Sequence, residues 1–258
     1  MNYQNISLQV ENKVAKLSIN RPKKLNALNR ATLQEIHEAL TDLKADESVK
    51  IIVLTGTGEK AFVAGADIAE FANYSEKEGE DLAAKGQELV FDYIANFPKP
   101  VIAAVNGFAL GGGLELAMAA HFRIASKNAK LGLPETSLGV IPGYGGTQRL
   151  PQLVGKGRAM EMIMTAKMIS AEEALQYGLV NHVCELEELD EKVNAVVQKI
   201  LGNSLQAIEA AIKAINDGYI DGVNGFESEI KAFGEAFGTE DFTEGTTAFL
   251  NKQKANFK

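Results

Sequence analysis

The sequence predicts an α/β fold, in which strands and helices alternate along the first two thirds of the chain. Three observations lead to this prediction. Short apolar runs have the length of buried strands, segments with apolar residues at helical spacing lie between them, and the region after residue 186 is helical in pattern throughout. Alternation of this kind is typical of an α/β core.

The N-terminal 45 residues predict a hairpin followed by a helix. Apolar and polar residues alternate over 6–10 and 14–19, and the segment 11–13 between them has the composition of a turn. The helix is expected to begin after Asn29, a residue type that caps helix N-termini. Its apolar residues recur three or four positions apart; they are Leu33, Ile36, Leu40 and Leu43.

Further strands and a second helix are predicted along the middle of the chain. Apolar segments at 51–54, 101–105 and 179–183 predict strands, and residues 79–95 predict a helix. Strands and helices therefore continue to alternate as far as residue 183.

The C-terminal quarter predicts helices only. They cover residues 186–201, 205–215, 225–237 and 242–254, with short polar segments between them. We therefore expect a domain boundary in the region 195–203, which divides the chain into a core of residues 1–198 and a helical region of residues 199–258.

The composition excludes several classes of protein. The 34 acidic and 26 basic side chains give a formal net charge of −8, which argues against nucleic-acid binding through overall charge. The single cysteine, Cys184, excludes an internal disulfide framework and a four-cysteine zinc site. His37, His121 and His182 have no metal-binding spacing, so no metal site is expected.

The sequence also lacks the features of a targeted or membrane protein. The N-terminus has neither the basic segment nor the apolar run of a signal peptide, and no stretch of about 18 uninterrupted apolar residues is present. The nearest candidate span, residues 101–120, is interrupted by Asn106, three consecutive glycines and Glu115. We therefore expect a cytoplasmic protein without a membrane partner.

One glycine motif has two interpretations. Residues 56–61 (GTGEKA) formally match the dinucleotide fingerprint GxGxxG/A. That fingerprint requires a helix opening at the glycines, whereas residues 63–66 (VAGA) interrupt the helical pattern soon afterwards. A loop that leaves a strand is therefore favoured over dinucleotide binding.

A concentration of glycines surrounds the first candidate for chemistry. Eleven of the 24 glycines lie between Gly107 and Gly157, and three of them precede Glu115 among small and apolar neighbours. Burying an ionised carboxylate is costly, so Glu115 is paired, raised in pKa or exposed on a short helix. The three glycines indicate either a tight strand-to-helix crossing or a helix start whose free amides bind an anion or oxyanion.

A second carboxylate, Glu135, follows a proline in the glycine-rich segment 133–149. Two carboxylates from separate segments, with an amide-rich turn between them, suit acid–base chemistry that passes through an oxyanion. Whether the two side chains converge depends on the fold.

Four motifs follow one another in order along the chain: residues 20–29 (NRPKKLNALN), 61–68 (AFVAGADI), 104–117 and 134–150. In order and spacing they resemble the enoyl-CoA hydratase/isomerase (crotonase) superfamily, and the similarity extends over essentially the whole chain. The resemblance implies a crotonase-type spiral of repeated ββα units, followed by a C-terminal helical region that forms trimers. The periodicity of the sequence does not by itself predict the spiral.

The resemblance also implies an active site. Glu115 and Glu135 fill the positions of the two glutamates of the family's hydratases, with Glu115 as the base and Glu135 as the proton donor. The thioester oxygen is expected to be held by the backbone amides of Ala66 and Gly112. This assignment favours the oxyanion interpretation of the consecutive glycines.

The same resemblance implies a set of contacts with coenzyme A. Backbone around Ala64 and Asp67–Ile68 is expected to meet the adenine, and Gly143 is expected to contact the substrate. Lys24 and Lys252, the latter from the same or a neighbouring subunit, are candidates for the CoA phosphates, with a solvated surface charge as the alternative for each.

The implied function is that of an enoyl-CoA hydratase, a hydro-lyase of fatty-acid or butyrate-type metabolism. It adds water reversibly and syn to trans-2-enoyl-CoA of short to medium chain length, with crotonyl-CoA the expected substrate, giving 3-hydroxyacyl-CoA. No cofactor is expected because coenzyme A is part of the substrate, and the expected assembly is a homotrimer or a hexamer of two trimers. The alternatives are a double-bond isomerase of the same superfamily and a non-catalytic member that binds RNA or joins a complex.

Overall fold

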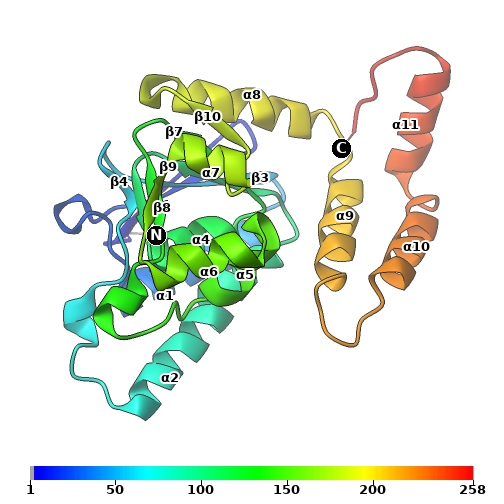
Figure 1. Ribbon diagram of the computed structural model, residues 1–258. Helices are drawn as coiled ribbons and strands as arrows, with labels where there is room; N and C mark the ends of the chain where they lie inside the picture. The colour runs from blue at the N-terminus through cyan, green and yellow to red at the C-terminus, as the bar shows by residue number, and fades with distance from the viewer. Residues whose placement is uncertain (1–2, 258) are drawn as a thin grey trace. The chain divides into compact units, whose positions relative to one another are not determined.

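The predicted hairpin forms one edge of the larger of two sheets in this computed structural model, which describes residues 3–257 (Figure 1). Strands β1 (Ile6–Glu11) and β2 (Val14–Ile19) pair antiparallel, with Ile6 opposite Ile19. Asn12 and Lys13 join them with φ values of 50° and 68°. Positive φ at both residues matches the right-handed twist of the two strands, which favours a two-residue hairpin loop.

The larger sheet has six strands in the order β1-β2-β3-β5-β7-β10, and every pair except β1–β2 is parallel. Its remaining strands are β3 (Ile51–Gly56), β5 (Val101–Val105), β7 (Phe122–Ser126) and β10 (His182–Cys184). Strands β3 and β5 are buried along their whole length, as expected for strands covered on both faces.

The smaller sheet has four strands in the order β4-β6-β8-β9, of which only β8 and β9 pair antiparallel. They are β4 (Ala61–Val63), β6 (Phe108–Leu110), β8 (Lys130–Gly132) and β9 (Met168–Ser170). Each is only three residues long, so none of them produces a recognisable period in the sequence.

The two sheets are built from a repeated unit. The chain passes from β3 to β4, from β5 to β6 and from β7 to β8, each time moving from the larger sheet to the smaller one before a helical segment follows. This arrangement confirms the α/β class and the spiral of ββα units that the resemblance implied.

The first predicted helix is confirmed, and its cap is the expected one. Helix α1 (Arg30–Ala45) begins after Asn29, whose side chain accepts a hydrogen bond of 2.9 Å from the amide of Thr32. The other helices before residue 189 are α2 (Glu76–Gly86), α3 (Asp92–Ala95), α4 (Gly112–Ala119), α5 (Gly146–Val154), α6 (Lys156–Met164) and α7 (Ala171–Tyr177).

Two predicted segments differ from the structure. The helix expected over 79–95 starts earlier, at Glu76, because Ser75 and Glu78 form a reciprocal capping box. It also contains a π-helical segment, η3 (Gln87–Phe91), between α2 and α3. The strand expected over 179–183 is shifted to β10, because Leu179 and Val180 are buried in the turn that follows α7.

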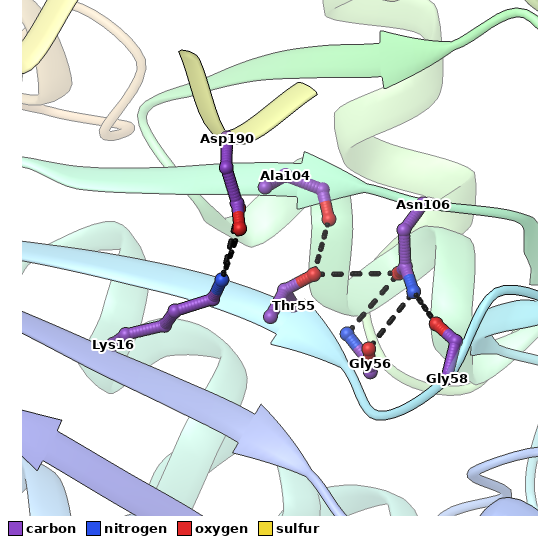
Figure 2. A network of polar contacts seen from close by, with 7 residues as sticks. All are labelled: Lys16, Thr55, Gly56, Gly58, Ala104, Asn106 and Asp190. Carbon is purple, nitrogen blue, oxygen red and sulfur yellow. Dashed lines mark hydrogen bonds and ion pairs between the residues drawn. The ribbon is translucent and has the colours of Figure 1, made fainter. Parts of the chain in front are cut away.

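The residues of the formal dinucleotide motif form a loop that leaves β3, as the favoured interpretation predicted, and this loop makes a crossing from the larger sheet to the smaller one. Strand β4 follows the motif instead of a helix, and a Cβ at Gly56 would lie 2.2 Å from the carbonyl oxygen of Ala61. The buried side chain of Asn106 fixes this crossing (Figure 2). It donates to the carbonyls of Gly56 and Gly58 and accepts from the Gly56 amide and the Thr55 hydroxyl.

The structure divides into two units. The first contains residues up to Ala95 together with Val101–Val193, and the second contains Asn96–Pro100 and the residues from Asn194 onward. Helix α8 (Leu189–Leu201) spans the division, which precedes the predicted boundary after residue 198. The helices that follow are α9 (Leu205–Asp217), α10 (Gly225–Ala236) and α11 (Glu240–Leu250), with α9 and α10 side by side (Figure 1).

Candidate active site

A cavity of about 280 Å³ lies within the first unit and is lined mainly by apolar groups. The start of α4, the turn after β4 and the 3₁₀ segment η4 (Glu135–Leu138) contribute to its wall. Among the predicted site residues, those that line the cavity are Ala64, Ala66, Ile68, Gly112, Glu115, Glu135 and Gly143. The fold therefore brings together both candidate carboxylates and both candidate amide donors.

Glu115 lies in the first turn of α4 and is almost completely buried, with 1% of its surface exposed. Its Oε1 accepts hydrogen bonds of 2.8 Å from the amides of Tyr144 and Gly146. Burial raises the pKa of Glu115 to about 7, with a contribution from the negative charge of Glu135, although the two amides act in the opposite direction. Glu115 is therefore poised to exchange a proton near neutral pH.

Glu135 reaches the same cavity from η4. Burial raises the pKa of this carboxyl as well, and its Oε2 is buried without a hydrogen-bond partner among the described residues. A Cβ at Gly111 would lie 2.8 Å from Oε1 of Glu135, and Gly111 has a φ of 51°. Only glycine suits both this conformation and this close approach. The consecutive glycines thus make room for the second carboxylate.

Two backbone amides on the cavity wall have no backbone acceptor in residues 3–257. Gly112 is the first residue of α4, where an amide has no partner within the helix. Ala66 faces Leu28 in a parallel bridge, whose two hydrogen bonds are made by the amides of Leu28 (to Gly65, 2.9 Å) and Asp67 (to Leu28, 2.7 Å). This pattern leaves the Ala66 amide unused. Both amides can therefore donate to an anionic oxygen in the cavity.

Helix α4 is held at both of its ends. Near its start, a Cβ at Gly113 would lie 1.9 Å from the carbonyl oxygen of Val63, so the helix backbone contacts strand β4 directly. At its end, the buried guanidinium of Arg123 donates to the carbonyls of Ala117 and Ala120. Burial lowers the pKa of Arg123 to about 10, and the carbonyls at the negative end of the helix stabilise the guanidinium charge.

Comparison with known families shows which family the chain belongs to. Residues 9–258 match the family model described as enoyl-CoA hydratase/isomerase. The chain belongs to the enoyl-CoA hydratase/isomerase family. The resemblance stated for the four sequence motifs is thereby confirmed.

Individual members of the enoyl-CoA hydratase/isomerase family are similar to the chain over nearly its full length. The crotonyl-CoA hydratase of Syntrophomonas wolfei is 51% identical over 100% of this chain and 99% of its own length. The short-chain-enoyl-CoA hydratase of Clostridium acetobutylicum is 49% identical, with coverages of 98% and 97%. The crystal structure of an enoyl-CoA hydratase from Bacillus anthracis matches with a TM-score of 0.93 and 42% identity, covering 99% of both chains.

Three other predicted site residues do not line the cavity. Asp67 forms an ion pair of 2.9 Å with Arg21. The hydrogen bond from Arg21 lowers the pKa of Asp67, and the charge of Lys24 adds to this effect, although partial desolvation acts in the opposite direction. Lys24 is exposed at the end of the 3₁₀ segment η1 (Pro22–Lys24). Lys252 is an exposed residue of the second unit. Their contacts with CoA stay predictions.

The structure adds residues to the site that the sequence did not single out. The ring of Tyr144 lines the cavity and stacks on Phe91, with centroids 4.5 Å apart and planes 11° apart. Arg149 donates to the carbonyl of Tyr144 at 3.0 Å and pairs with Asp92, which supports the loop that donates to Glu115. Tyr144 and Arg149 both stand in the 134–150 motif, but only the folded loop turns them toward Glu115.

The structure shows no metal centre or membrane helix in residues 3–257. No group of three or more histidine, cysteine, aspartate or glutamate side chains there could hold a metal ion. His121 is half-buried, accepts a hydrogen bond of 2.9 Å from the amide of Val101, and has a pKa lowered to about 4 by desolvation. None of the helices in the same range is long and apolar enough to cross a bilayer.

The raised pKa of Glu115 predicts a dependence of stability on pH. In the unfolded chain this carboxyl titrates near its usual value of 4.5, so the folded state binds the proton more tightly and loses stability as the pH rises toward about 7. At about pH 8 the substitution Glu115→Gln should therefore stabilise the protein, by at most about 3 kcal/mol at ~1.4 kcal/mol per pKa unit. At about pH 4 the difference in unfolding free energy between this variant and the wild-type protein should nearly vanish.

Urea unfolding across this pH range measures the effect. Glu161→Gln, which changes an exposed glutamate of α6, is the matched control and should show no such trend. A stability difference for Glu115→Gln that is constant over the pH range would contradict the prediction.

Proposed function

We propose that this chain is an enoyl-CoA hydratase that catalyses the reversible syn addition of water to trans-2-enoyl-CoA, giving 3-hydroxyacyl-CoA. The observation that carries the proposal is that buried Glu115, half-buried Glu135 and two unused backbone amides all lie on the wall of one cavity. The identity to hydratases of Syntrophomonas wolfei and Clostridium acetobutylicum supports the same reaction.

In this mechanism the carboxylates of Glu115 and Glu135 hold one water molecule between them. Ionised Glu115 removes a proton from the water as its oxygen bonds to the β carbon of the substrate, and the electron pair of the double bond moves toward the thioester. Protonated Glu135 gives its proton to the α carbon. The Oε2 of Glu135 has no hydrogen-bond donor among the described residues to stabilise its ionised form, whereas two amides donate to Glu115, and this difference supports the donor role of Glu135.

The backbone amides of Ala66 and Gly112 stabilise the negative charge that develops on the thioester oxygen. Gly112 adds the partial positive charge at the start of α4 to its own N–H. One donor of this kind typically contributes about 3 to 4 kcal/mol to transition-state stabilisation. The charge is created only during the reaction, so the amides favour the transition state over the bound substrate.

A kinetic comparison of two substrates tests the proposal. The purified protein should hydrate crotonyl-CoA and should act on a 3-enoyl-CoA far more slowly. Preference for the 3-enoyl-CoA, with 2-enoyl-CoA as the product, would instead assign the alternative double-bond isomerase. If the protein had neither activity but bound RNA tightly and in a salt-sensitive way in a filter-binding assay, it would be a non-catalytic binding protein.

The proposal includes a set of contacts for CoA and no separate cofactor. Ala64 and Ile68 line the cavity close to the turn that carries Ala66, which supports a role for this backbone next to the adenine. The exposed side chains of Lys24 and Lys252 are the proposed partners of the CoA phosphates, since a chain with a net charge of −8 needs local cations to bind a polyanion. Gly143 contributes to the cavity wall.

The position of the Tyr144 ring supports a preference for substrates with short acyl chains. The ring lies against Gly112, the proposed oxyanion donor, and a Cβ at Gly86 would lie 2.2 Å from it. The contacts with Gly86 and the stack on Phe91 hold the ring in place beside the reaction centre. The names of the two relatives, crotonyl-CoA hydratase and short-chain-enoyl-CoA hydratase, agree with this preference.

Removal of the Tyr144 ring is expected to extend the range of substrates. Tyr144→Ala should raise the ratio of kcat/KM for a ten-carbon 2-enoyl-CoA to that for crotonyl-CoA by about tenfold or more, since one methylene in an apolar pocket contributes about 1 to 3 kcal/mol. Steady-state kinetics over a series of chain lengths measures this ratio. Tyr144→Phe keeps the ring and should leave the ratio unchanged. A wild-type ratio in folded Tyr144→Ala would exclude the proposed role of the ring.

We further propose a homotrimer, or a hexamer of two trimers, in the cytoplasm. Large apolar side chains of the second unit are exposed on the single chain, which supports its use in subunit contacts; they include Ile215, Tyr219, Phe226, Ile230, Phe233, Phe249 and Leu250. A mass measurement in solution distinguishes a monomer, a trimer and a hexamer.

A further inference from the structure

The turn that presents the Ala66 amide is held by a neighbouring segment of the chain. Residues 25–28 lie beside residues 64–67, and three backbone hydrogen bonds of 2.7 to 3.0 Å join the two segments. Two of these bonds are made by Leu28, on either side of its bridge to Ala66. The direction of the Ala66 N–H therefore depends on the position of residues 25–28.

Arg21 connects these two segments through one guanidinium group. Its Nη1 donates to the carbonyl of Ala27, and its Nη2 donates to Oδ2 of Asp67 at 2.9 Å. The side chains of Arg21 and Asp67 are only 14% and 17% exposed, so water competes little with this contact. Ala27 and Asp67 directly adjoin Leu28 and Ala66, the two residues of the bridge.

The backbone of Arg21 is held in place as well. Its amide donates to the side-chain oxygen of Asn26 at 3.0 Å, and its carbonyl accepts from the amide of Asn26 at 2.9 Å. The Asn26 side chain is buried and donates to the carbonyls of Thr57 and Ala61. The guanidinium therefore extends from a rigid anchor at the crossing between the two sheets.

We propose that Arg21 and Asp67 form a positioning pair that holds the Ala66 amide in the direction required for oxyanion stabilisation, an inference that rests on the proposed function. Neither side chain lines the cavity, so the pair acts through the backbone and not on the substrate. Preorganised donors are effective because they need no reorientation as charge develops. A misplacement of about 1 Å can reduce the rate by about 10²-fold.

The planar guanidinium is central to this role. It presents several N–H groups in a fixed geometry, so it can donate to two acceptors on different segments at once. The ammonium of lysine is a compact charge on a flexible stem and does not reproduce this geometry. Arg21→Lys keeps the charge and loses the connection, while Asp67→Asn keeps the shape and loses the ion pair.

Kinetics and infrared spectroscopy of the full-length protein test the pair. Arg21→Lys and Asp67→Asn should each lower kcat for crotonyl-CoA by about 10- to 100-fold, with a much smaller change in the dissociation constant of butyryl-CoA, which has no double bond to hydrate. The thioester carbonyl stretch of bound butyryl-CoA should shift less from its value in solution than it does in the wild-type protein. The double variant should be no slower than the slower single variant, because both changes break one connection.

The surface ion pair of Lys16 with Asp190 provides the matched control (Figure 2). Lys16→Gln removes a contact of 2.8 Å between exposed side chains and should leave kcat and the carbonyl stretch unchanged.

Two results would overturn the inference. One is a wild-type kcat and carbonyl stretch in both folded variants. The other is a loss of butyryl-CoA affinity with kcat unchanged, which would assign the pair to CoA binding. A wild-type protein that binds butyryl-CoA and shifts its carbonyl stretch, but does not hydrate crotonyl-CoA, would refute the proposed function and not the pair.

Discussion

Replacing either Glu115 or Glu135 with glutamine is expected to lower kcat for crotonyl-CoA hydration by about 10³-fold or more. Each carboxyl is proposed to move a proton in the transition state, and one such group typically contributes about 10²- to 10⁴-fold. Glutamine can still accept the hydrogen bonds that Tyr144 and Gly146 donate to Glu115, so the loop and the cavity should persist. Steady-state kinetics measures the loss.

Binding and additivity distinguish lost chemistry from lost structure. The dissociation constant of butyryl-CoA should change little in either variant, because the amides of Ala66 and Gly112 remain. The double variant should be only slightly slower than the single ones, since the two carboxyls act as a unit on one water molecule and one substrate. The exposed substitution Glu161→Gln should have wild-type kinetics. A kcat within about tenfold of wild type in both single variants would exclude the two-carboxylate mechanism.

Substitution of Gly113 by alanine is expected to have the second large effect, on the fold and the activity together. The added Cβ would lie 1.9 Å from the carbonyl oxygen of Val63 and 2.8 Å from its Cβ, so α4 and β4 must move apart. Overpacking of this kind typically costs about 1 to 3 kcal/mol, or more where backbone blocks the new group. The movement would also separate Gly112 from Ala66, since α4 carries the first and the chain after β4 carries the second.

A lower urea midpoint and a lower kcat are therefore expected for Gly113→Ala. Gly157→Ala is the matched control, because Gly157 also lies near the start of a helix, α6, but has nothing within 4 Å of an added Cβ. This control should leave the unfolding free energy unchanged or raise it by up to about 1 kcal/mol, since alanine favours the helix more than glycine does. Equal stability of the two variants would contradict the close contact between α4 and β4.

Much of the fold follows from local patterns, whereas the missed π-helical segment lies at a contact between distant segments. The hairpin, α1 and its Asn29 cap were predicted because alternation, helical spacing and capping act over a few residues. The helix over 79–95 was predicted without its π-helical segment, which begins after Gly86, where α2 passes close to the Tyr144 ring. That contact joins residues far apart in the sequence, and no local pattern reports it.

In the candidate site, too, some residues could be identified from the sequence and others only from the fold. Residue types and the family motifs identified Glu115, Glu135, Ala66 and Gly112. The sequence left the role of Arg21 unexplained, because its partner Asp67 lies 46 residues further along the chain and only the fold brings the two side chains together.

The sequence by itself determined the α/β class, the family and the two candidate carboxylates, since these depend on the order and spacing of residues along the chain. Tertiary structure decided which of several open alternatives holds at each site. It buries Glu115 with two amide donors, makes room for Glu135 beside Gly111, and leaves the amides of Ala66 and Gly112 unused. The physical reason is that pKa, burial and hydrogen-bond satisfaction depend on groups brought together from distant segments, and only the packed fold specifies them.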